Sequence, residues 1–349
     1  MKIYYYDTGN ISQMHRDWKS GHFPGQYLYG VTHLHKYGID TMLHKHRSGS
    51  GFSRALYILI QVLKHKKEIN AIYATTTVGL ELLILLRAIR IVRLPIIVWQ
   101  KTPITQSTPF DKLFYKGIDK MLFYSEQVMQ ATEASGLIES ERLQFIHWGA
   151  DLEFYDKIMF FNEDPKTNRF ISTGNECIDM PSIIRAFTAT GLPLDIYIKE
   201  YAHGDNYLQI LNDLRPSPNV HVNFVKETTP VELPSKVYAS SCVIISLQET
   251  NYATGLATLL EALALGMPVI CTKNPNLPIN VEKEGIGKVI PYYNAVDWEE
   301  TIRDFANNPA QLKAMSNHAR ALADNIYNLE NCTREVSAVL IQVVKNMDN

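Results

Sequence analysis

Short runs of β-branched and aromatic residues alternate with helical patterns along almost the whole chain, and this alternation restricts the possible folds more than any other feature. The first half predicts strands at 2–7, 41–46, 71–75, 95–99, 120–125 and 143–147, and helices at 26–37, 53–67, 78–91, 109–117 and 126–135. The second half predicts strands at 169–173, 194–199, 220–225, 242–246, 268–272 and 287–291, and helices at 181–189, 205–214, 234–239, 255–265, 296–306, 309–326 and 329–346. Strands that alternate with helices form parallel sheets through right-handed crossovers. The sequence therefore predicts an α/β protein.

The length of 349 residues favours two domains over a single core. A polar segment that contains a proline, DKIMFFNEDPKTN, predicts a linker at 156–168. We expect an N-terminal domain at 1–155, a C-terminal domain at 169–328, and a last segment, 329–349, whose helix can pack back on the N-terminal domain. Because ligands bind at the carboxyl ends of parallel strands, two Rossmann-like domains would face each other across a cleft that holds the site.

Several classes of protein are disfavoured by the composition. The four cysteines are scattered without a Cys-x-x-Cys pair, which argues against a zinc site or a disulfide framework and is typical of a reducing compartment. The sequence shows neither a signal peptide nor an apolar run long enough to span a membrane, so we expect a cytoplasmic protein. GSGFSR at 49–54 and GIGK at 285–288 lack the spacing of nucleotide-binding glycine motifs and are interpreted as turns.

The two halves of the chain carry opposite charge. Residues 1–150 contain 18 Lys and Arg against 11 Asp and Glu, whereas residues 151–349 contain 16 against 25. Such an asymmetry indicates two domains with different partners. The basic half could meet anionic lipid, nucleic acid or an anionic substrate, or it could face the acidic half.

The stretch YATGLATLLEALALGMPVI at 252–270 places one acid, Glu261, inside an otherwise apolar helix. Thr254 is a candidate cap for a helix that starts at Gly255, and a capped helix N-terminus is a ready anion site. Glu261 follows Thr254 by about two turns, roughly 10 Å along the axis, on nearly the same face. That spacing suits a ligand with a diphosphate at one end and a ribose at the other. The alternative is a partly exposed helical glutamate without a ligand.

LLEALALGMPVI, followed by TKNPNLP, resembles the donor-binding region of GT-B-fold glycosyltransferases of the retaining family 4 kind. FPGQYLYGVTHLHKYGID at 23–40 is similar to the glycine loop and first helix of that family. Similar segments at 123–155 and 223–249 extend the resemblance over nearly the whole chain. Each motif is loose, but their order and spacing together are fairly specific.

The resemblance implies roles for individual donor-side residues. Glu261 matches the second acid of the Glu-x7-Glu motif, which holds the nucleotide ribose. Ala253 stands where the first acid, which contacts the donor sugar, is expected, and Glu249 and Thr254 are possible substitutes. The backbone amides of Gly255 and Leu256 fall where the diphosphate and sugar bind.

Further positions depart from the family pattern. The stretch that begins with Gly174 has Asn175 where the family has an arginine, and Lys199 is a candidate replacement for the missing positive charge. In the N-terminal domain, Lys101 follows the fourth strand where a histidine is often found. Lys101 and Glu249 are the candidate catalytic residues, because each could contact the donor sugar or its phosphates.

On the acceptor side, Gly25 matches the glycine loop near the phosphate and acceptor. His15 and His22 lie in GNISQMHRDWKSGHFPG, which is predicted as a long loop and which could contribute to an acceptor site. Trp99 and Trp148 stand at strand ends, where core packing is the better interpretation.

The basic groups of the N-terminal domain have two interpretations. Arg87, Arg90 and Arg93 form a slanting row, and 64–67 (KHKK) ends the preceding helix. These cations either complement helix dipoles or form a patch that rests on anionic lipid on the inner face of the membrane. Nucleic-acid binding is disfavoured, because no basic motif is interleaved with aromatic residues.

The function implied by the resemblance is transfer of a sugar from a UDP- or GDP-sugar to a glycan or lipid-linked acceptor, with retention of configuration and without a metal or other cofactor. Such a reaction belongs to the synthesis of surface polysaccharides or glycoconjugates. Two alternatives stay open: a non-catalytic partner subunit that binds a nucleotide or glycan, and a sugar-nucleotide epimerase of the same fold.

Overall fold

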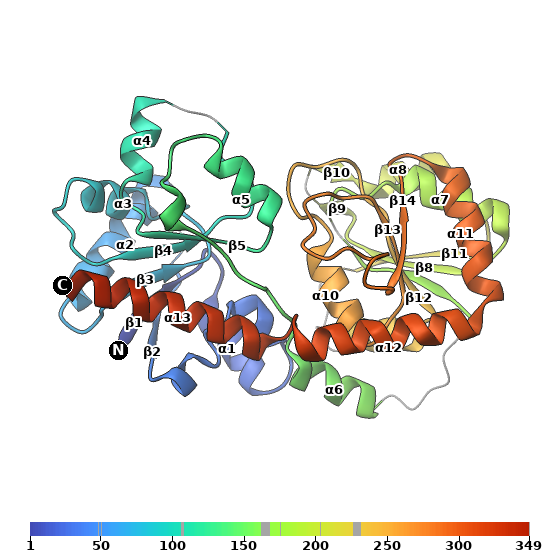
Figure 1. Cartoon of the computed structure of the whole chain (residues 1–349). Coiled ribbons are helices and arrows are strands. Elements are labelled where there is room, and N and C mark those ends of the chain that lie inside the picture. Colours follow the sequence, from blue (N-terminus) through green and yellow to red (C-terminus); the bar gives the residue numbers. More distant parts are fainter. Residues whose placement is uncertain are drawn as a thin grey trace. The chain divides into compact units, whose positions relative to one another are not determined.

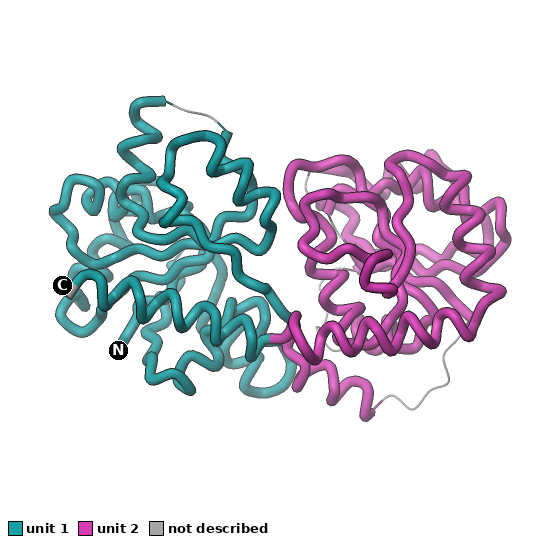
Figure 2. Tube along the Cα trace, viewed as in Figure 1, with its two compact units in different colours: residues 1–149, 329–349 teal, residues 150–328 magenta. Residues whose placement is uncertain are grey.

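The computed structural model describes residues 1–47, 49, 51–105, 108–161, 168–174, 176–202, 204–225 and 232–348. The chain forms two compact units (Figure 2). Unit 1 contains residues 1–149 and 329–349, and unit 2 contains residues 150–328.

Unit 1 is built on a parallel sheet that has six strands in its described part, in the order β2-β1-β3-β4-β5-β6 (Figure 1). The strands are β1 (Lys2–Tyr6), β2 (Asp40–Leu43), β3 (Ala71–Ala74), β4 (Ile96–Trp99), β5 (Lys120–Phe123) and β6 (Leu143–Phe145). The helices are α1 (Ile11–Lys19), α2 (Gly51–His65), α3 (Glu81–Ala88), α4 (Pro109–Tyr115), α5 (Glu126–Glu133) and α13 (Leu329–Asp348), with 3-10 turns η1 (Gly25–Leu28), η2 (Leu34–Tyr37) and η3 (Ser140–Arg142). β3, β4 and the ends of β1 and β5 are buried, as expected for strands covered by helices on both faces.

The helix predicted at 26–37 is not formed. The chain makes the two short turns η1 and η2 there, because Tyr29 (φ 50°) and Gly30 (φ 86°) adopt left-handed backbone conformations that end a helix. A side chain at position 30 would also approach Thr333 of α13 to 3.3 Å. The left-handed bend therefore lets the backbone of this segment lie against the last helix.

Helix α13 is part of unit 1 (Figure 1). Polar contacts from several of its residues fix it there. The Thr333 hydroxyl donates to the Gly30 carbonyl (3.3 Å). Glu335 accepts from the backbone N–H of His147 (2.8 Å) and pairs with its Nδ1 (2.9 Å). Glu330 pairs with Lys36 at 2.7 Å. One face of α13 is buried at Cys332, Val336 and Leu340, with the helical spacing of an amphipathic element.

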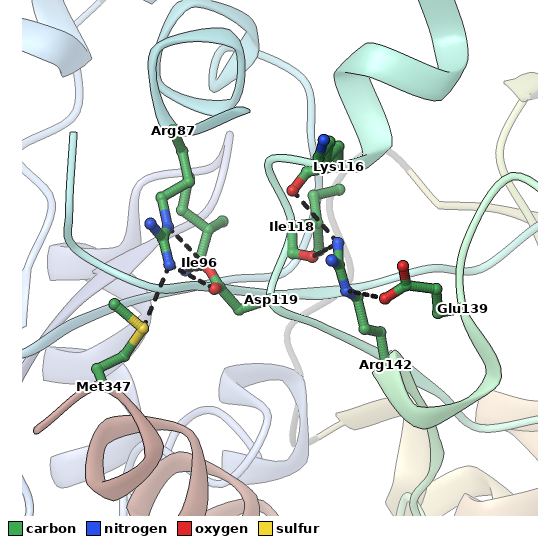
Figure 3. Close-up of polar contacts among 8 residues, drawn as sticks. All are labelled: Arg87, Ile96, Lys116, Ile118, Asp119, Glu139, Arg142 and Met347. Carbon is green, nitrogen blue, oxygen red and sulfur yellow. Dashed lines mark hydrogen bonds and ion pairs between the residues drawn. The ribbon is translucent and has the colours of Figure 1, made fainter. Parts of the chain in front are cut away.

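Arg87 does not join Arg90 and Arg93 in a basic row. Its guanidinium makes two hydrogen bonds to the Asp119 carboxylate, at 2.6 and 3.1 Å, and a contact of 3.3 Å with the sulfur of Met347 (Figure 3). Asp119 also accepts from the backbone N–H of Ile96 (2.8 Å). The pair ties the end of α3 to the start of β4 and β5. The positive charge of Arg87 is therefore compensated within unit 1.

Unit 2 repeats the architecture, with a parallel sheet in the order β11-β8-β7-β12-β13-β14 over its described residues. Its strands are β7 (Phe170–Ser172), β8 (Leu194–Ile198), β11 (Val220–Phe224), β12 (Cys242–Ile245), β13 (Val269–Thr272) and β14 (Gly287–Ile290), and β9 (Tyr201–Ala202) and β10 (Asp205–Asn206) form a small hairpin. Its helices are α6 (Leu152–Phe161), α7 (Met180–Thr190), α8 (Tyr207–Leu214), α9 (Glu232–Ala239), α10 (Leu256–Ala264), α11 (Ala295–Asn307) and α12 (Pro309–Asn325). The prediction of two Rossmann-like parallel-sheet domains is confirmed.

The boundary between the units differs from the predicted one. It falls at Gly149 and Ala150, and the first part of the predicted linker at 156–168 is the second half of α6. Phe154, Tyr155 and Ile158 are buried along one face of that helix, so it packs within unit 2. Residues 162–167 of the predicted linker lie outside the described residues.

None of the helices in the described ranges has the length and apolarity needed to cross a bilayer.

Candidate functional site

Two loops at the carboxyl ends of β7 and β12 are held together by hydrogen bonds to backbone carbonyls. The Gln248 N–H donates to the Cys177 carbonyl (2.7 Å). Ser246 binds Asp179 twice, through its hydroxyl (2.9 Å) and through its carbonyl (3.3 Å). The carboxyl ends of neighbouring parallel strands meet at one sheet edge, which is where ligands bind in open α/β sheets. We call the edge formed by the loops after β7, β12 and β13 the unit 2 edge.

A third loop, after β13, supports the β12 loop through side-chain hydrogen bonds. Asn274 donates through its side-chain amide to the carbonyls of Tyr252 (3.0 Å) and Thr254 (3.2 Å). Asn276 donates in the same way to the carbonyl of Thr250 (3.2 Å). The sequence alone does not indicate this role, because the two asparagines of TKNPNLP act through contacts with another loop.

The start of α10 shows why position 255 is a glycine. Gly255 is the N-cap residue, with φ 85°, and a Cβ there would lie 2.9 Å from Ile245 and 3.0 Å from Leu247. Thr254 does not cap the helix, contrary to the prediction. It is buried, and its hydroxyl pairs with that of Thr250 (2.8 Å), because the left-handed glycine turns the preceding residue away from the helix N-terminus.

The backbone amides of Gly255 and Leu256, both predicted to meet the diphosphate and sugar, differ in their surroundings. Gly255 stands at the helix entrance, whereas the N–H of the buried Leu256 donates to the Ala253 carbonyl (3.2 Å). The first N–H groups of any α-helix lack partners within the helix and carry a partial positive charge. The N-terminus of α10 therefore presents an electropositive backbone at the unit 2 edge.

Glu261 lies on α10 among buried leucines and is only partly exposed. Burial raises the pKa of its carboxyl group to about 7, and a hydrogen bond from Tyr155 opposes this rise. The Tyr155 hydroxyl on α6 donates to Glu261 Oε2 across 3.5 Å. A carboxyl group with so weak a partner is unusual in a protein interior, because burying it is costly unless it is well paired. Its free acceptor capacity is suited to hydroxyl donors from a ligand.

The other predicted donor-side residues are distributed around the same edge. A Cβ on Gly174 would lie 4.0 Å from the hydroxyl of Thr258, so the β7 loop reaches the first turn of α10. Glu249 is exposed, and its backbone N–H donates to the Tyr293 hydroxyl (3.3 Å). Lys199 is exposed just after β8, the strand next to β7. Asn175 lies outside the described residues.

At the corresponding edge of unit 1, aromatic rings brace the turn that begins at Gly25. Gly25 is buried and opens η1. The indole N–H of Trp148 donates to the Gln26 carbonyl (3.0 Å), and its ring stacks on Tyr29 at 5.5 Å. The exposed Lys101 places its ammonium 5.6 Å from the Tyr29 ring centre, within reach of a cation–π contact. The structure thus brings Lys101 and the Gly25 turn together around Tyr29.

The predicted loop that carries His15 and His22 is mostly helical, which corrects the sequence interpretation. Ile11–Lys19 form α1, because Asn10 caps the helix by accepting from the N–H of Gln13. His15 packs on Trp18 (5.5 Å between ring centres), and burial together with Lys19 lowers the pKa of this histidine. His22 is exposed beyond the helix and pairs with Ser20 (2.9 Å).

Within the described ranges, no group of three or more His, Cys, Asp or Glu side chains is placed to hold a metal ion.

One segment of the chain matches a known protein family. Residues 216–322, the segment that contains α10 and the β12 and β13 loops, match the family model described as glycosyl transferases group 1. No curated protein matches the sequence significantly.

Solved structures resemble the chain over nearly its full length. Anabaena Alr3699/HepE in complex with UDP is 14% identical over 98% of this chain and 100% of that chain, with a TM-score of 0.67. Sucrose-phosphate synthase from Thermosynechococcus elongatus is 14% identical over 99% of both chains, with a TM-score of 0.72. UDP-GlcNAc 2-epimerase from Neisseria meningitidis, bound to UDP-GlcNAc, is 13% identical over 98% of this chain and 100% of that chain, with a TM-score of 0.59.

Identities this low establish the fold alone. The chain thus has the GT-B fold, which confirms the resemblance found in the sequence. Its segment 216–322 is of the glycosyl transferases group 1 type.

Proposed function

We propose that the protein is a glycosyltransferase that takes a sugar from a nucleoside-diphosphate sugar and transfers it to a glycan or lipid-linked acceptor with retention of configuration. The observation that carries the proposal is the pairing, on one helix, of an electropositive N-terminus at Gly255 with the weakly partnered carboxyl of Glu261. The matched family segment contains both features. A similar solved structure, Anabaena HepE, binds UDP, which favours a UDP-sugar over a GDP-sugar as the first donor to test.

In this proposal the donor lies along α10. The two ribose hydroxyls donate to the Glu261 carboxylate, and the diphosphate meets the amides at the start of α10 and the loop of Gly174. Fixed backbone dipoles at this point would stabilise the charge that develops on the leaving diphosphate. This electrostatic stabilisation needs no metal or other cofactor, and Lys199 at the end of β8 would add positive charge.

The sugar would be handled by the two candidate catalytic residues. Glu249, exposed on the β12 loop, would replace the family acid that is absent at Ala253 and would accept hydrogen bonds from hydroxyl groups of the donor sugar. Lys101, held beside Tyr29, would contact the sugar or a phosphate from unit 1. The turn at Gly25, with His15 and His22 on and beyond α1, would bind the acceptor.

We assign this activity to the cytoplasm, where it would contribute to the synthesis of surface polysaccharides or glycoconjugates. The four cysteines are free thiols, which fits a reducing compartment. A lipid-linked acceptor would place the reaction at the inner face of the membrane.

One of the similar solved structures is an epimerase, so the fold does not identify the reaction and the activity must be tested directly. The purified protein is incubated with UDP-glucose and UDP-GlcNAc, and the products are separated by chromatography. Slow release of UDP and free sugar, lost in Glu249→Gln or Lys101→Ala, supports a transferase that hydrolyses its donor when no acceptor is present. Interconversion of two sugar nucleotides identifies an epimerase, and tight binding without turnover, even with a panel of glycan acceptors, identifies a binding subunit.

A further inference from the structure

Helix α2 has an apolar stripe on the face that points away from the core. Phe52, Leu56, Ile60 and Leu63 are 71, 41, 52 and 41% exposed, with the spacing of one helical face. The opposite face, Ala55, Ile58 and Val62, is buried against unit 1. A helix that covers a sheet normally presents polar residues to water, so α2 carries apolar side chains beyond what packing of the unit requires.

The neighbouring helices extend this surface. Helix α2 contacts α3, and α3 contacts α4 (Figure 1). Ile89 and Ile91, just after α3, are 54 and 68% exposed, and Phe110 and Leu113 on α4 are 58 and 41% exposed. Among the described residues, nine of the sixteen large exposed hydrophobic side chains come from residues 52–113. We call the outer surface of α2, α3 and α4, with the exposed residues after α3, the α2–α4 face.

Positive charge accompanies the apolar side chains. Residues 51–116 contain ten Lys and Arg against three Asp and Glu. Lys64, Lys66 and Lys67 are exposed at the end of α2, and Arg90 and Arg93 are exposed beyond α3. Arg87 alone among the row predicted from the sequence is neutralised, by Asp119 (Figure 3). The basic character of the face therefore comes from exposed lysines and arginines around apolar residues.

A cavity of about 260 Å³ at the start of α2 joins the two kinds of side chain. Its walls include the apolar Leu56 and Ile60 of the stripe and the cationic Arg47 and Arg54. The Arg47 guanidinium lies over the Tyr57 ring at 5.3 Å from its centre. Guanidinium groups bind phosphate oxygens well, and an apolar wall next to them suits the first carbons of an acyl chain.

We propose that the α2–α4 face is a docking surface for a bilayer that contains anionic phospholipid. Apolar residues would enter the headgroup boundary, exposed cations would meet anionic headgroups, and the cavity would take a lipid phosphate. A second copy of this chain is a poor occupant, because the same excess of positive charge on both copies would repel. The proposal deepens the proposed function, since it assigns the acceptor to a membrane, but the surface can be tested without donor or acceptor.

The test is sedimentation of the full-length protein with vesicles of phosphatidylglycerol and phosphatidylcholine in equal parts, against vesicles of phosphatidylcholine alone. We expect binding to the anionic vesicles that weakens in about 0.5 M salt, where screening is nearly complete over a few ångströms. Leu56→Asn with Ile60→Asn should raise the lipid concentration needed for half-binding about tenfold or more, because two exposed side chains no longer enter the lipid. Lys64→Gln with Lys67→Gln should have a similar effect on anionic vesicles only.

Val296→Asn, at a side chain 63% exposed on α11, and Lys313→Gln on α12 are the matched controls and should bind like the wild type. All substituted side chains are exposed, so the unfolding temperature should stay unchanged. Equal binding to both kinds of vesicle, or wild-type binding by both double variants, would overturn the proposal. So would a dimer in lipid-free solution that the Leu56/Ile60 double variant dissociates. Any shift of unfolding temperature by UDP is recorded in parallel, so that a failed docking surface is distinguished from a failed donor site.

Discussion

At the scale of single residues, Glu261 is the most informative position in unit 2. A buried carboxyl whose pKa is raised to about 7 favours its protonated form in the folded state. The unfolded chain has an ordinary glutamate pKa near 4.3. Between these values the folded state binds more protons, so the contribution of this group to stability is present below about pH 4.3 and is lost as the pH rises to about 7. The protein keeps a site that costs stability at neutral pH, which is common where a group serves a ligand.

The substitution Glu261→Gln should remove this cost. We expect the variant to be more stable than the wild type by about 1–3 kcal/mol at pH 8, with the difference shrinking towards zero near pH 4.5. Thermal unfolding of both proteins across this pH range measures the effect. A difference that does not change with pH would mean that the carboxyl titrates normally and that its burial has no electrostatic consequence.

Gly255 is a second residue with a sharp expectation. Gly255→Ala should destabilise unit 2 by about 1–3 kcal/mol, because the new Cβ would contact Ile245 and Leu247 and because φ 85° is strained for alanine. Urea unfolding, followed by a probe in unit 2, measures the loss. Gly191→Ala is the matched control. That glycine is also left-handed, but no atom lies within 4 Å of its added Cβ, so it reports the backbone strain alone. An equal effect at both positions would argue against crowding at the α10 entrance.

At the scale of elements, α13 shows how the C-terminal segment of the chain is attached to the rest of unit 1. The Glu335 carboxylate, by accepting a hydrogen bond from the ring, raises the pKa of His147 above its ordinary value of about 6.5. The stabilisation from this pair is therefore present below about pH 6.5 and is lost as the pH rises through the raised pKa of the folded state.

Hydrogen exchange of the α13 amides tests this pair. After correction for the intrinsic exchange rates, we expect protection to be greater at pH 6 than at pH 8 in the wild type. In Glu335→Gln the dependence on pH should largely disappear. Glu330→Gln, which removes the partner of Lys36 instead, should retain the pH dependence. A wild-type helix whose protection is the same at both pH values would contradict this account of its attachment.

The elements were largely predictable from the sequence, and the reasons are physical. Runs such as PIIVW and CVIIS predict buried parallel strands, because both faces of such strands are covered. The helix expected at 26–37 does not form, because Tyr29, a non-glycine residue, adopts a left-handed conformation that leaves no signal in the sequence. Asn10 caps α1 within a polar stretch from which a loop is expected.

Only part of the candidate site could be predicted from the sequence. Glu261, Gly255 and Gly174 were named from local pattern and resemblance, and they lie around the unit 2 edge. Tyr155, which is more than a hundred residues away from Glu261, and the supporting pair Asn274 and Asn276 could not be named, because their importance depends on tertiary contacts. Likewise, the pairing of Arg87 with Asp119 separates this arginine from a row that looked continuous along the helix.

At the scale of the whole molecule, the opposite charges of the two halves agree with a division of labour. Unit 1 carries the basic and apolar α2–α4 face, and unit 2 carries the proposed donor site at the carboxyl edge of its sheet. A nucleotide that binds only the folded protein should raise its stability, by about 2.7 kcal/mol at 100 times the dissociation constant. The central claim is therefore that unit 2 binds a nucleoside diphosphate through Glu261.

The most direct test is calorimetric titration of UDP, GDP and their glucose conjugates into the wild type, Glu261→Gln and Glu284→Gln. Glu284 is an exposed carboxylate of the same unit and serves as the matched control. We predict that one nucleotide binds the wild type and the control equally, and binds Glu261→Gln about tenfold or more weakly, since charged hydrogen bonds to the ribose are lost. Affinity of the wild type relative to Glu261→Gln should also rise as the pH passes 7. Equal affinity of all three proteins, or no binding of any nucleotide to the folded wild type, would contradict the claim.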